Sequence, residues 1–374
     1  MNSDGDSVTN TKHQFNTRTA SGVDGYDPFV RGRFPVAVRT VQARDAVRDR
    51  PFSCEIWYPA AEYHAGRDLA PDTRDFFTVP PSDAPRSQMA VRDAAAQPGT
   101  YPLILFSHPS GTHRRVSTFL CTHLTSHGYV VAALDHSEVV AVELARRAGE
   151  THEQKAERVE AVIASRVPDT RFLLDHLMTS AALDPETHVD PTRIGVVGHS
   201  FGGWTALAIP EVDPRIRAVV ALAPAGSSRP KPGILPVKLT FGWDRDVPTL
   251  YLVAENDVAL PLAGMHEIFD RTPATKRMVI LRRADHCHFM DNVEEAHETL
   301  RAMPPTGEVA WLPKEMRPMA ELCSGKHAHL FTRGLTLCHM DATLKGHDEA
   351  RRWLLGDVKG ELAARGVDAI VCHG

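Results

Sequence analysis

Residues 193–204, RIGVVGHSFGGW, place a serine between glycines in the pattern G-x-S-x-G. An apolar run precedes Ser200 and the helix-forming stretch TALAI follows it, which is the context that a nucleophile elbow requires. The turn must be sharp enough to lift the hydroxyl clear of a sheet, and glycine on both sides removes side chains that would clash. We therefore expect Ser200 to be the nucleophile of an acyl-transfer reaction.

A serine hydroxyl needs a general base and a third group that holds the base in the correct tautomer. His286 lies in ADHCHF after the apolar run RMVIL, and Asp257 lies in AENDVALP after the apolar run TLYLVA. Both would follow the carboxyl ends of parallel strands, and the order serine, acid, histidine is that of α/β-hydrolases. We predict that Asp257 orients His286 as the general base. The alternatives are Glu255 for the acid and His288 for the base.

Other polar residues nearby fit these roles less well. Asp244 and Asp246 precede the TLYLVA run, so they would lie at the wrong end of that strand. The pair His286 and His288 has a spacing seen in metal sites, but Asp291 is its one nearby companion. We expect no metal ion and no cofactor. A later stretch, GKHAH, is expected at the surface; its polar residues are Lys326, His327 and His329.

The tetrahedral intermediate of acyl transfer carries an oxyanion that needs two preorganised donors. One donor is the backbone N–H of the residue after the nucleophile, which is Phe201. The other is expected from the loop SHPSGTHRR, which follows the apolar run LILF. Pro109 has no N–H, so the candidate donor is Ser110, with Gly111 as the second choice.

The elements that would position these residues are indicated by short apolar runs without polar alternation, as in strands buried on both faces of a parallel sheet. Stretches with helical period lie between most of these runs. The alternation predicts an α/β fold, with a mostly parallel central sheet and helices on both faces. A hairpin is predicted at one sheet edge from residues 35–42 and 52–58. The apolar runs are residues 103–106, 129–134, 194–198, 216–222, 249–254 and 277–281.

The segments outside this alternation have their own character. Residues 1–27 are polar and are expected to form a flexible arm before a single domain of residues 28–374. The Pro-rich residues 59–100 are expected to be a long surface excursion. The charged residues 138–166 are expected to be a helical lid or cap over the active site, or else an ordinary pair of surface helices. In the C-terminal extension, residues 292–374, the stretch 341–366 is expected to form one or two amphipathic helices that pack on the sheet.

Composition narrows the choice of partner. The chain has 42 Lys and Arg against 47 Asp and Glu with no long run of one sign, which argues against nucleic acid or a membrane surface as partner. We expect a small-molecule ester as substrate, and the sequence leaves a homodimer open. The N-terminal residues carry no apolar stretch long enough for a signal peptide or a membrane span, so we expect a cytoplasmic protein. The six scattered cysteines predict buried free thiols.

Several motifs together resemble a known group of enzymes. The segments LILFSHPSG, HGYVVAALDH, GHSFGGW, ADHCHF and EIWYPA are similar to bacterial relatives of platelet-activating-factor acetylhydrolase and dienelactone hydrolase. The stretch AENDVALP is similar to the cutinase-like polyester hydrolases, and the likeness covers residues 27–292. The resemblance implies an α/β-hydrolase fold and a serine esterase that cleaves a small or short-chain carboxylic ester through an acyl-enzyme.

Three departures qualify that resemblance. The acetylhydrolases carry their acid after the strand that follows the nucleophile helix, but here that strand ends VVALAPAG without an acid, so the placement of Asp257 is cutinase-like. Dienelactone hydrolases use cysteine where this chain has Ser200. Pro109 replaces a glycine of the usual H-G-x-G loop and should stiffen it. The alternative functions are an amide or lactone hydrolase with the same triad, or a non-catalytic ligand-binding protein of this fold.

Overall fold

A central sheet runs through the computed structural model, which describes residues 25–79, 82–137, 147–179 and 183–373. Within those residues the sheet has ten strands in the order β12-β11-β10-β9-β8-β6-β7-β2-β1-β5. The six apolar runs predicted as strands are confirmed as β6 to β11. The bounds of the strands are β1 (Val36–Asp45), β2 (Arg50–Pro59), β5 (Val91–Arg92), β6 (Gly99–Ser107), β7 (Val130–Leu134), β8 (Thr187–His199), β9 (Ile216–Leu222), β10 (Thr249–Ala254), β11 (Lys276–Leu281) and β12 (Ala369–His373).

The pairing directions separate a parallel centre from antiparallel flanks. Strands β7, β6, β8, β9, β10 and β11 pair in parallel. The predicted hairpin is confirmed, because β1 and β2 pair antiparallel and β2 continues antiparallel onto β7. On the opposite side β12 pairs antiparallel with β11. The carboxyl ends of the parallel strands therefore meet at one edge of the sheet, where ligands bind in folds of this kind.

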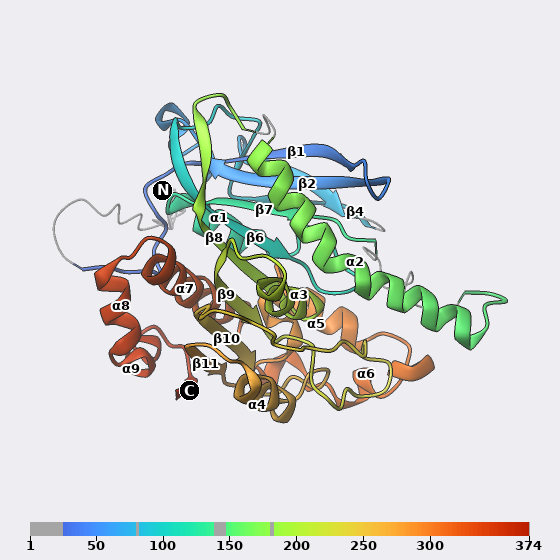
Figure 1. Ribbon diagram of the computed structural model, residues 1–374. Coiled ribbons are helices and arrows are strands. Elements are labelled where there is room, and N and C mark those ends of the chain that lie inside the picture. Colours follow the sequence, from blue (N-terminus) through green and yellow to red (C-terminus); the bar gives the residue numbers. More distant parts are fainter. Residues whose placement is uncertain (1–24, 80–81, 138–146, 180–182, 374) are drawn as a thin grey trace, which may run out of the picture.

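The strands are covered by helices on both faces (Figure 1). Alternate residues of β6 point to opposite sides: Leu103 and Leu105 join one buried cluster, whereas Ile104 and Phe106 join the other. The first cluster is completed by α2 (His152–Thr179), α3 (Phe201–Ala208) and α4 (Leu262–Arg271). The second is completed by α1 (Thr118–Ser126) and α7 (Gly325–Leu344). This is the layered arrangement that the sequence predicts.

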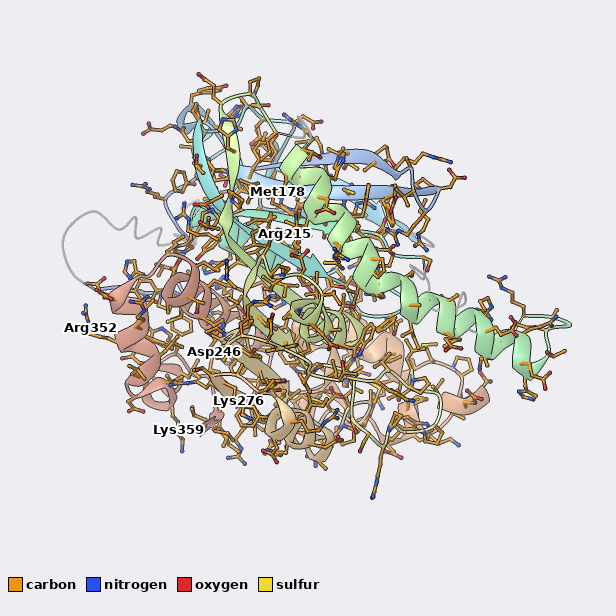
Figure 2. All side chains as sticks on the ribbon, viewed as in Figure 1. Met178, Arg215, Asp246, Lys276, Arg352 and Lys359 are labelled. Carbon is orange, nitrogen blue, oxygen red and sulfur yellow. The ribbon has the colours of Figure 1, made fainter. Side chains whose placement is uncertain are left out.

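Helix α2 is longer than the sequence suggests. Among the described residues one helix runs from His152 to Thr179 and continues through Pro168, so it joins the end of the predicted insertion to the helical stretch that follows it. Residues 138–146 of the predicted insertion lie outside the described residues, as do residues 1–24 of the predicted arm. Figure 1 shows the first turns of α2 projecting beyond the sheet. At its other end Met178, labelled in Figure 2, packs against the core, and Arg215 before β9 binds Asp175 of α2 at 2.7 Å.

The predicted surface excursion, residues 59–100, has more structure than expected. Its strands β3 (Asp75–Val79) and β4 (Ser82–Gln88) form a separate antiparallel hairpin. Its third strand, β5, pairs in parallel with β1, so β5 and not the β1–β2 hairpin forms the sheet edge. A short helical turn, η1 (Glu62–His64), precedes them. Arg92 connects β5 to both neighbouring hairpins, because it binds Glu55 of β2 at 3.0 Å and Asp75 of β3 at 2.7 Å.

The C-terminal extension contains helices, as predicted, but it is mainly α7 that packs its apolar residues on the strands, whereas Ala350 of α8 (Asp348–Leu355) packs against α7. The extension also adds a strand that was not predicted. Strand β12 lies on β11 with Ile370 opposite Ile280. None of the helices in the described part of the chain is both long and apolar enough to cross a bilayer. The remaining elements are η3 (Ile209–Glu211), η4 (His286–Phe289), α5 (Val293–Arg301), η5 (Gly307–Val309), α6 (Leu312–Glu315), η6 (Met319–Glu321) and α9 (Val358–Ala363).

Candidate active site

Ser200 forms the turn between β8 and α3 and adopts a strained backbone conformation. Its φ is 58° and its ψ is −116°, a combination that residues with a side chain rarely adopt. Two backbone hydrogen bonds hold the turn: the Ser200 N–H donates to the Leu222 carbonyl at 2.9 Å, and the Ala225 N–H donates to the Ser200 carbonyl at 2.9 Å. The end of β9 therefore fixes the position of Ser200.

The glycines of the motif are required by close backbone contacts. A Cβ on Gly198 would lie 1.9 Å from the carbonyl oxygen of Gly202, and a Cβ on Gly202 would lie 1.9 Å from the carbonyl oxygen of Ser107. Both distances are far below van der Waals contact, so no larger residue fits without movement of the backbone. The second contact also brings the first turn of α3 against the end of β6.

His286 and Asp257 come together from neighbouring loops after β11 and β10. The His286 Nδ1 atom lies 2.6 Å from Asp257 Oδ2, and the Leu260 N–H donates to Asp257 Oδ1 at 2.8 Å. The carboxylate is buried and the imidazole is largely buried. A carboxylate at Nδ1 favours the tautomer in which Nδ1 carries the proton and Nε2 is free to accept one.

A second carboxylate, Asp285, lies beside the same imidazole. Its Oδ1 accepts the backbone N–H of His286 at 2.6 Å, and its Oδ2 lies 3.7 Å from Nδ1 of His297. Burial disfavours the charged imidazolium of His286, but Asp257 and then Asp285 outweigh that effect and raise the pKa of His286 above its usual value. Burial and the nearby Asp257 in turn raise the pKa of Asp285.

His199, directly before the serine, packs against the candidate base. Its ring centroid lies 4.8 Å from that of His286 and 5.4 Å from that of Phe289. The ring is fully buried, and this burial together with His286 lowers the pKa of His199 well below its usual value. His199 is therefore neutral at physiological pH and limits the movement of the His286 ring.

The alternative residues considered from the sequence have other partners. Glu255 accepts hydrogen bonds from Arg282 and from the backbone of Arg283. His288 donates from Nε2 to the carbonyl of Cys323 at 3.0 Å. The two aspartates before β10 are also engaged elsewhere: Asp244 pairs with Arg245, and Asp246 accepts from Thr275. The structure does not bring these residues into the arrangement of Asp257 and His286.

The two expected oxyanion donors, Phe201 and Ser110, border the same cavity as Ser200 and His286. Phe201 is the first residue of α3, and Ser110 lies in the loop after β6. Within the described residues no hydrogen bond uses the backbone N–H of either residue. Gly111, the second choice, also borders the cavity. Two unused N–H groups at one cavity are what an oxyanion site needs.

The cavity has a volume of about 900 Å³ and mostly apolar walls. Helix α2 lines one side of the cavity with its first turns, and a lid or cap role for residues 138–166 stays a prediction. Two ion pairs lie at the cavity: Lys155 of α2 with Glu308 at 3.2 Å, and Arg86 of β4 with Glu295 of α5 at 3.1 Å. The apolar lining includes Ala156, Val159, Ile234, Leu235, Leu260, Met290, Leu300 and Met303.

The cysteines and the metal-ligating residue types can be placed in the structure. All six cysteines are free thiols; Cys372 is half-buried and the others are buried, as predicted. In the part of the chain that the structure describes, no three His, Cys, Asp or Glu side chains are grouped so that they could hold a metal ion. His329, expected at the surface, is half-buried, stacks on Phe119 and donates to the carbonyl of Met290.

Two family models match the chain. The model described as platelet-activating factor acetylhydrolase, isoform II, matches residues 40–173. The model described as PET hydrolase-like matches residues 111–326, which is more than half of the 374 residues. The chain belongs to the PET hydrolase-like family. The matched segment of this family includes Ser200, Asp257 and His286.

Relatives of this PET hydrolase-like chain come from both groups that the motifs resemble. Cutinase est1 of Thermobifida alba is 25% identical over 60% of this chain and 64% of its own length. The platelet-activating factor acetylhydrolase of Cavia porcellus is 27% identical over 33% of this chain and 35% of its own length. The chain thus spans less than two thirds of either relative.

A solved structure supports the fold of this PET hydrolase-like chain. The ferulic acid esterase from Streptomyces cinnamoneus has a TM-score of 0.59 at 23% identity, covering 84% of this chain and 92% of the other. With the mostly parallel sheet and the helices on both faces, this likeness confirms the α/β-hydrolase fold.

Sequence reasoning missed Asp285 and His199 as neighbours of the candidate base in this PET hydrolase-like chain. Both residues lie directly beside motif residues, because Asp285 precedes His286 and His199 precedes Ser200. Their position next to a motif residue in the sequence could therefore have indicated that they lie near the site. Their burial and their contacts depend on how the loops pack, and no spacing rule predicts that packing.

Proposed function

We propose that this protein is a carboxylic ester hydrolase with Ser200 as nucleophile, His286 as general base and Asp257 as the acid that orients it. One observation carries the proposal: His286, joined to Asp257 at 2.6 Å, borders the same cavity as Ser200, which has a strained elbow conformation. A strained serine beside an oriented imidazole is the arrangement that activates a hydroxyl.

In the proposed reaction the Ser200 Oγ attacks the ester carbonyl while His286 Nε2 takes its proton. The N–H groups of Phe201 and Ser110 donate to the oxyanion of the tetrahedral intermediate. His286 then donates the proton to the leaving alcohol, which breaks the ester C–O bond and leaves an acyl-enzyme. Water, deprotonated by His286, attacks the acyl carbonyl and releases the acid. No cofactor is needed for these steps.

The cavity indicates which esters to try. Its volume of about 900 Å³ falls in the range that holds drug-sized ligands and exceeds what an acetyl or butyryl group fills. We propose small-molecule esters as substrates, and we infer that medium-length acyl groups are accepted as well as the short ones expected from the sequence. Each additional buried CH₂ contributes about 0.8 kcal/mol, so kcat/KM should rise up to roughly fourfold per carbon until the cavity is filled.

Hydrolysis of p-nitrophenyl esters from acetate to decanoate, by the native protein and by Ser200→Ala, tests the proposal. We expect native turnover that rises from acetate toward hexanoate. Turnover by Ser200→Ala should fall by roughly three decades or more, the scale of triad loss. Thr179→Ala, an exposed change at the far end of α2, is the control and should keep native activity.

Other outcomes point to other functions. Turnover of p-nitroanilides but not of p-nitrophenyl esters would replace the ester proposal by amide hydrolysis, and turnover of lactones alone would indicate a lactonase. If no acyl substrate is turned over and a fluorophosphonate probe does not label Ser200, the site binds a ligand without catalysis.

A further inference from the structure

Arg166 is a charged residue in the hydrophobic core. It lies on α2, its exposed fraction is 0%, and it shares the inward face of the helix with Leu173 and Leu177. An arginine side chain keeps its positive charge, and burying a charge costs free energy unless hydrogen bonds and counter-charges compensate for it. The partners of Arg166 therefore indicate what this position does.

Those partners are the end of β6 and the first residues of the loop that carries Ser110. Arg166 Nη1 donates to the carbonyl of His108 at 2.6 Å and to Ser107 Oγ at 3.2 Å. Arg166 Nη2 makes a longer hydrogen bond, 3.4 Å, to the carbonyl of Pro109. The guanidinium thus binds three consecutive residues immediately before Ser110.

The carbonyl of Pro109 belongs to the same peptide unit as the N–H of Ser110. Besides Arg166, it accepts hydrogen bonds from His108 Nδ1 at 2.7 Å and from Thr112 Oγ1 at 2.9 Å. A trans peptide unit is planar, and its C=O and N–H point in opposite directions. Three donors that hold the carbonyl therefore fix the direction of the Ser110 N–H, and they also polarise it.

The same guanidinium contacts the other expected donor residue. Its central carbon lies 4.2 Å from the centroid of the Phe201 ring. A guanidinium over an aromatic face is an attractive contact, and it is stronger when both groups are buried. Because Phe201 begins α3, this contact sets the position of the first helical turn and of its N–H relative to the Ser110 loop.

We propose that Arg166 is a positioning residue that sets the two oxyanion donors, the N–H groups of Ser110 and Phe201, in one fixed geometry. This inference rests on the proposed function, because it assigns a role in the same site. Arg166 is not among the residues that line the cavity, so it acts through the loop and the Phe201 ring and not on the substrate.

A second connection from α2 reaches the same loop. Asp169, three residues after Arg166, accepts from Arg48 at 2.6 Å and from Arg50 at 3.0 Å, and it lies 3.1 Å from His136 Nδ1. His136 Nε2 lies 3.3 Å from Ser107 Oγ. The carboxylate of Asp169 thus provides counter-charge near Arg166, and His136 holds the hydroxyl that Arg166 also binds.

The test compares native protein with Arg166→Met, which keeps the side-chain length but removes the donors and the charge. On p-nitrophenyl butyrate we expect kcat to fall by roughly 10- to 100-fold, because misaligning donors costs somewhat less than removing one. KM should change by less than about threefold, since the cavity wall is intact. Arg166→Lys, which retains one charged donor, should recover part of the loss.

A transition-state mimic separates positioning from general loosening. A trifluoromethyl ketone adds to the nucleophilic serine and places an oxyanion between the two N–H groups, so its Ki should rise in Arg166→Met by the same factor by which kcat falls. Leu174→Ala is the control, because Leu174 is fully buried on the same helix but belongs to the apolar core cluster. It should lower the Tm and leave kcat and Ki within about twofold of native.

If Arg166→Met does not fold, Thr112→Val and Arg166→Lys replace it. Thr112→Val removes one donor to the Pro109 carbonyl, so kcat should fall and Ki should rise together by roughly three- to tenfold. Two results would overturn the inference: unchanged kcat and Ki in the folded Arg166 variants and in Thr112→Val, or a loss in Leu174→Ala as large as that in Arg166→Met. In either case turnover by the native protein would leave the proposed function standing. Absence of native turnover would instead remove the proposed function, and the inference with it.

Discussion

At the scale of single residues, the candidate base lies between two carboxylates with different roles. Asp257 binds the Nδ1 atom of His286 directly, whereas Asp285 binds its backbone N–H. Asp257 therefore determines the tautomer of the His286 ring and also favours its charged form. Asp285 acts on the ring by its charge alone, so the two contributions can be separated by isosteric substitution.

Asp285→Asn should move the acidic limb of the kcat/KM profile to lower pH. The base is active when neutral, so kcat/KM rises as pH passes the pKa of His286; removing one of the two carboxylates that raise this pKa lowers it. Because the asparagine oxygen can still accept the His286 N–H, the plateau should stay within roughly threefold of native. The profile is measured from pH 5 to 9 on p-nitrophenyl butyrate.

Asp246→Asn is the matched control, since Asp246, which lies before β10, is exposed and accepts hydrogen bonds from Thr275 (Figure 2). The acidic limb of its kcat/KM profile should coincide with that of the native protein. A limb of Asp285→Asn that stays in place or moves to higher pH would show that Asp285 does not raise the pKa of His286.

The predictability of the site differs from residue to residue. That Ser200, Asp257 and His286 lie at the same edge of the sheet could be predicted, because each follows a strand and the three occur in the order of the fold; their catalytic roles stay proposals. The burial of Arg166 could have been predicted from helical periodicity, because it stands seven residues before Leu173 and eleven before Leu177, on the face of the helix that must be apolar. Its partners, the carbonyls of His108 and Pro109, could not be predicted, since backbone contacts between distant elements leave no mark in the sequence.

At the scale of elements, the alternation of apolar runs predicted the parallel strands, while short non-local pairings escaped prediction. Strand β12 has five residues and pairs with β11, about ninety residues earlier in the chain. Strand β5 has two residues and is placed by the ion pairs of Arg92. Neither strand is long enough for a periodic signal.

The first turns of α2 should control which acyl groups fit. Val159 lines the cavity, so Val159→Trp fills part of its volume. We expect kcat/KM for p-nitrophenyl decanoate to fall by about tenfold or more, because overpacking costs 1 to 3 kcal/mol, and the value for the acetate to stay within about twofold.

Glu160→Trp is the control on the next residue, which is exposed and is not part of the cavity lining. Both esters should be hydrolysed at native rates by this variant. Equal losses for decanoate and acetate in Val159→Trp would mean that α2 does not border the acyl site.

At the scale of the whole molecule, buried neutral histidines should limit stability in acid. Burial lowers the pKa of His288 and of His339 to about 4, whereas an unfolded chain titrates them near 6.5. His339 donates from Nε2 to the carbonyl of Pro248 at 3.1 Å, a bond that either protonation state can make, so burial is what favours the neutral ring in the folded protein. A homodimer and a cytoplasmic location stay predictions of the sequence.

The melting temperature should therefore fall as pH decreases from about 6.5 toward 4. In this range the unfolded chain binds more protons than the folded one, and each such histidine removes roughly 1.4 kcal/mol per pH unit. Differential scanning fluorimetry from pH 4.5 to 8 measures this. His339→Gln, which retains a donor for Pro248, should have a shallower slope than the native protein. A native Tm that is flat over the range, or equal slopes in both proteins, would contradict the prediction.

The most direct test of the proposed triad is to trap the acyl group. The protein is mixed with p-nitrophenyl butyrate, quenched in acid within milliseconds to seconds and analysed by intact mass and peptide mapping. The mechanism predicts the mass of one butyryl group on the peptide that contains Ser200, and no adduct in Ser200→Ala or His286→Ala. A butyryl group on any other residue, or native turnover that persists in Ser200→Ala, would contradict it.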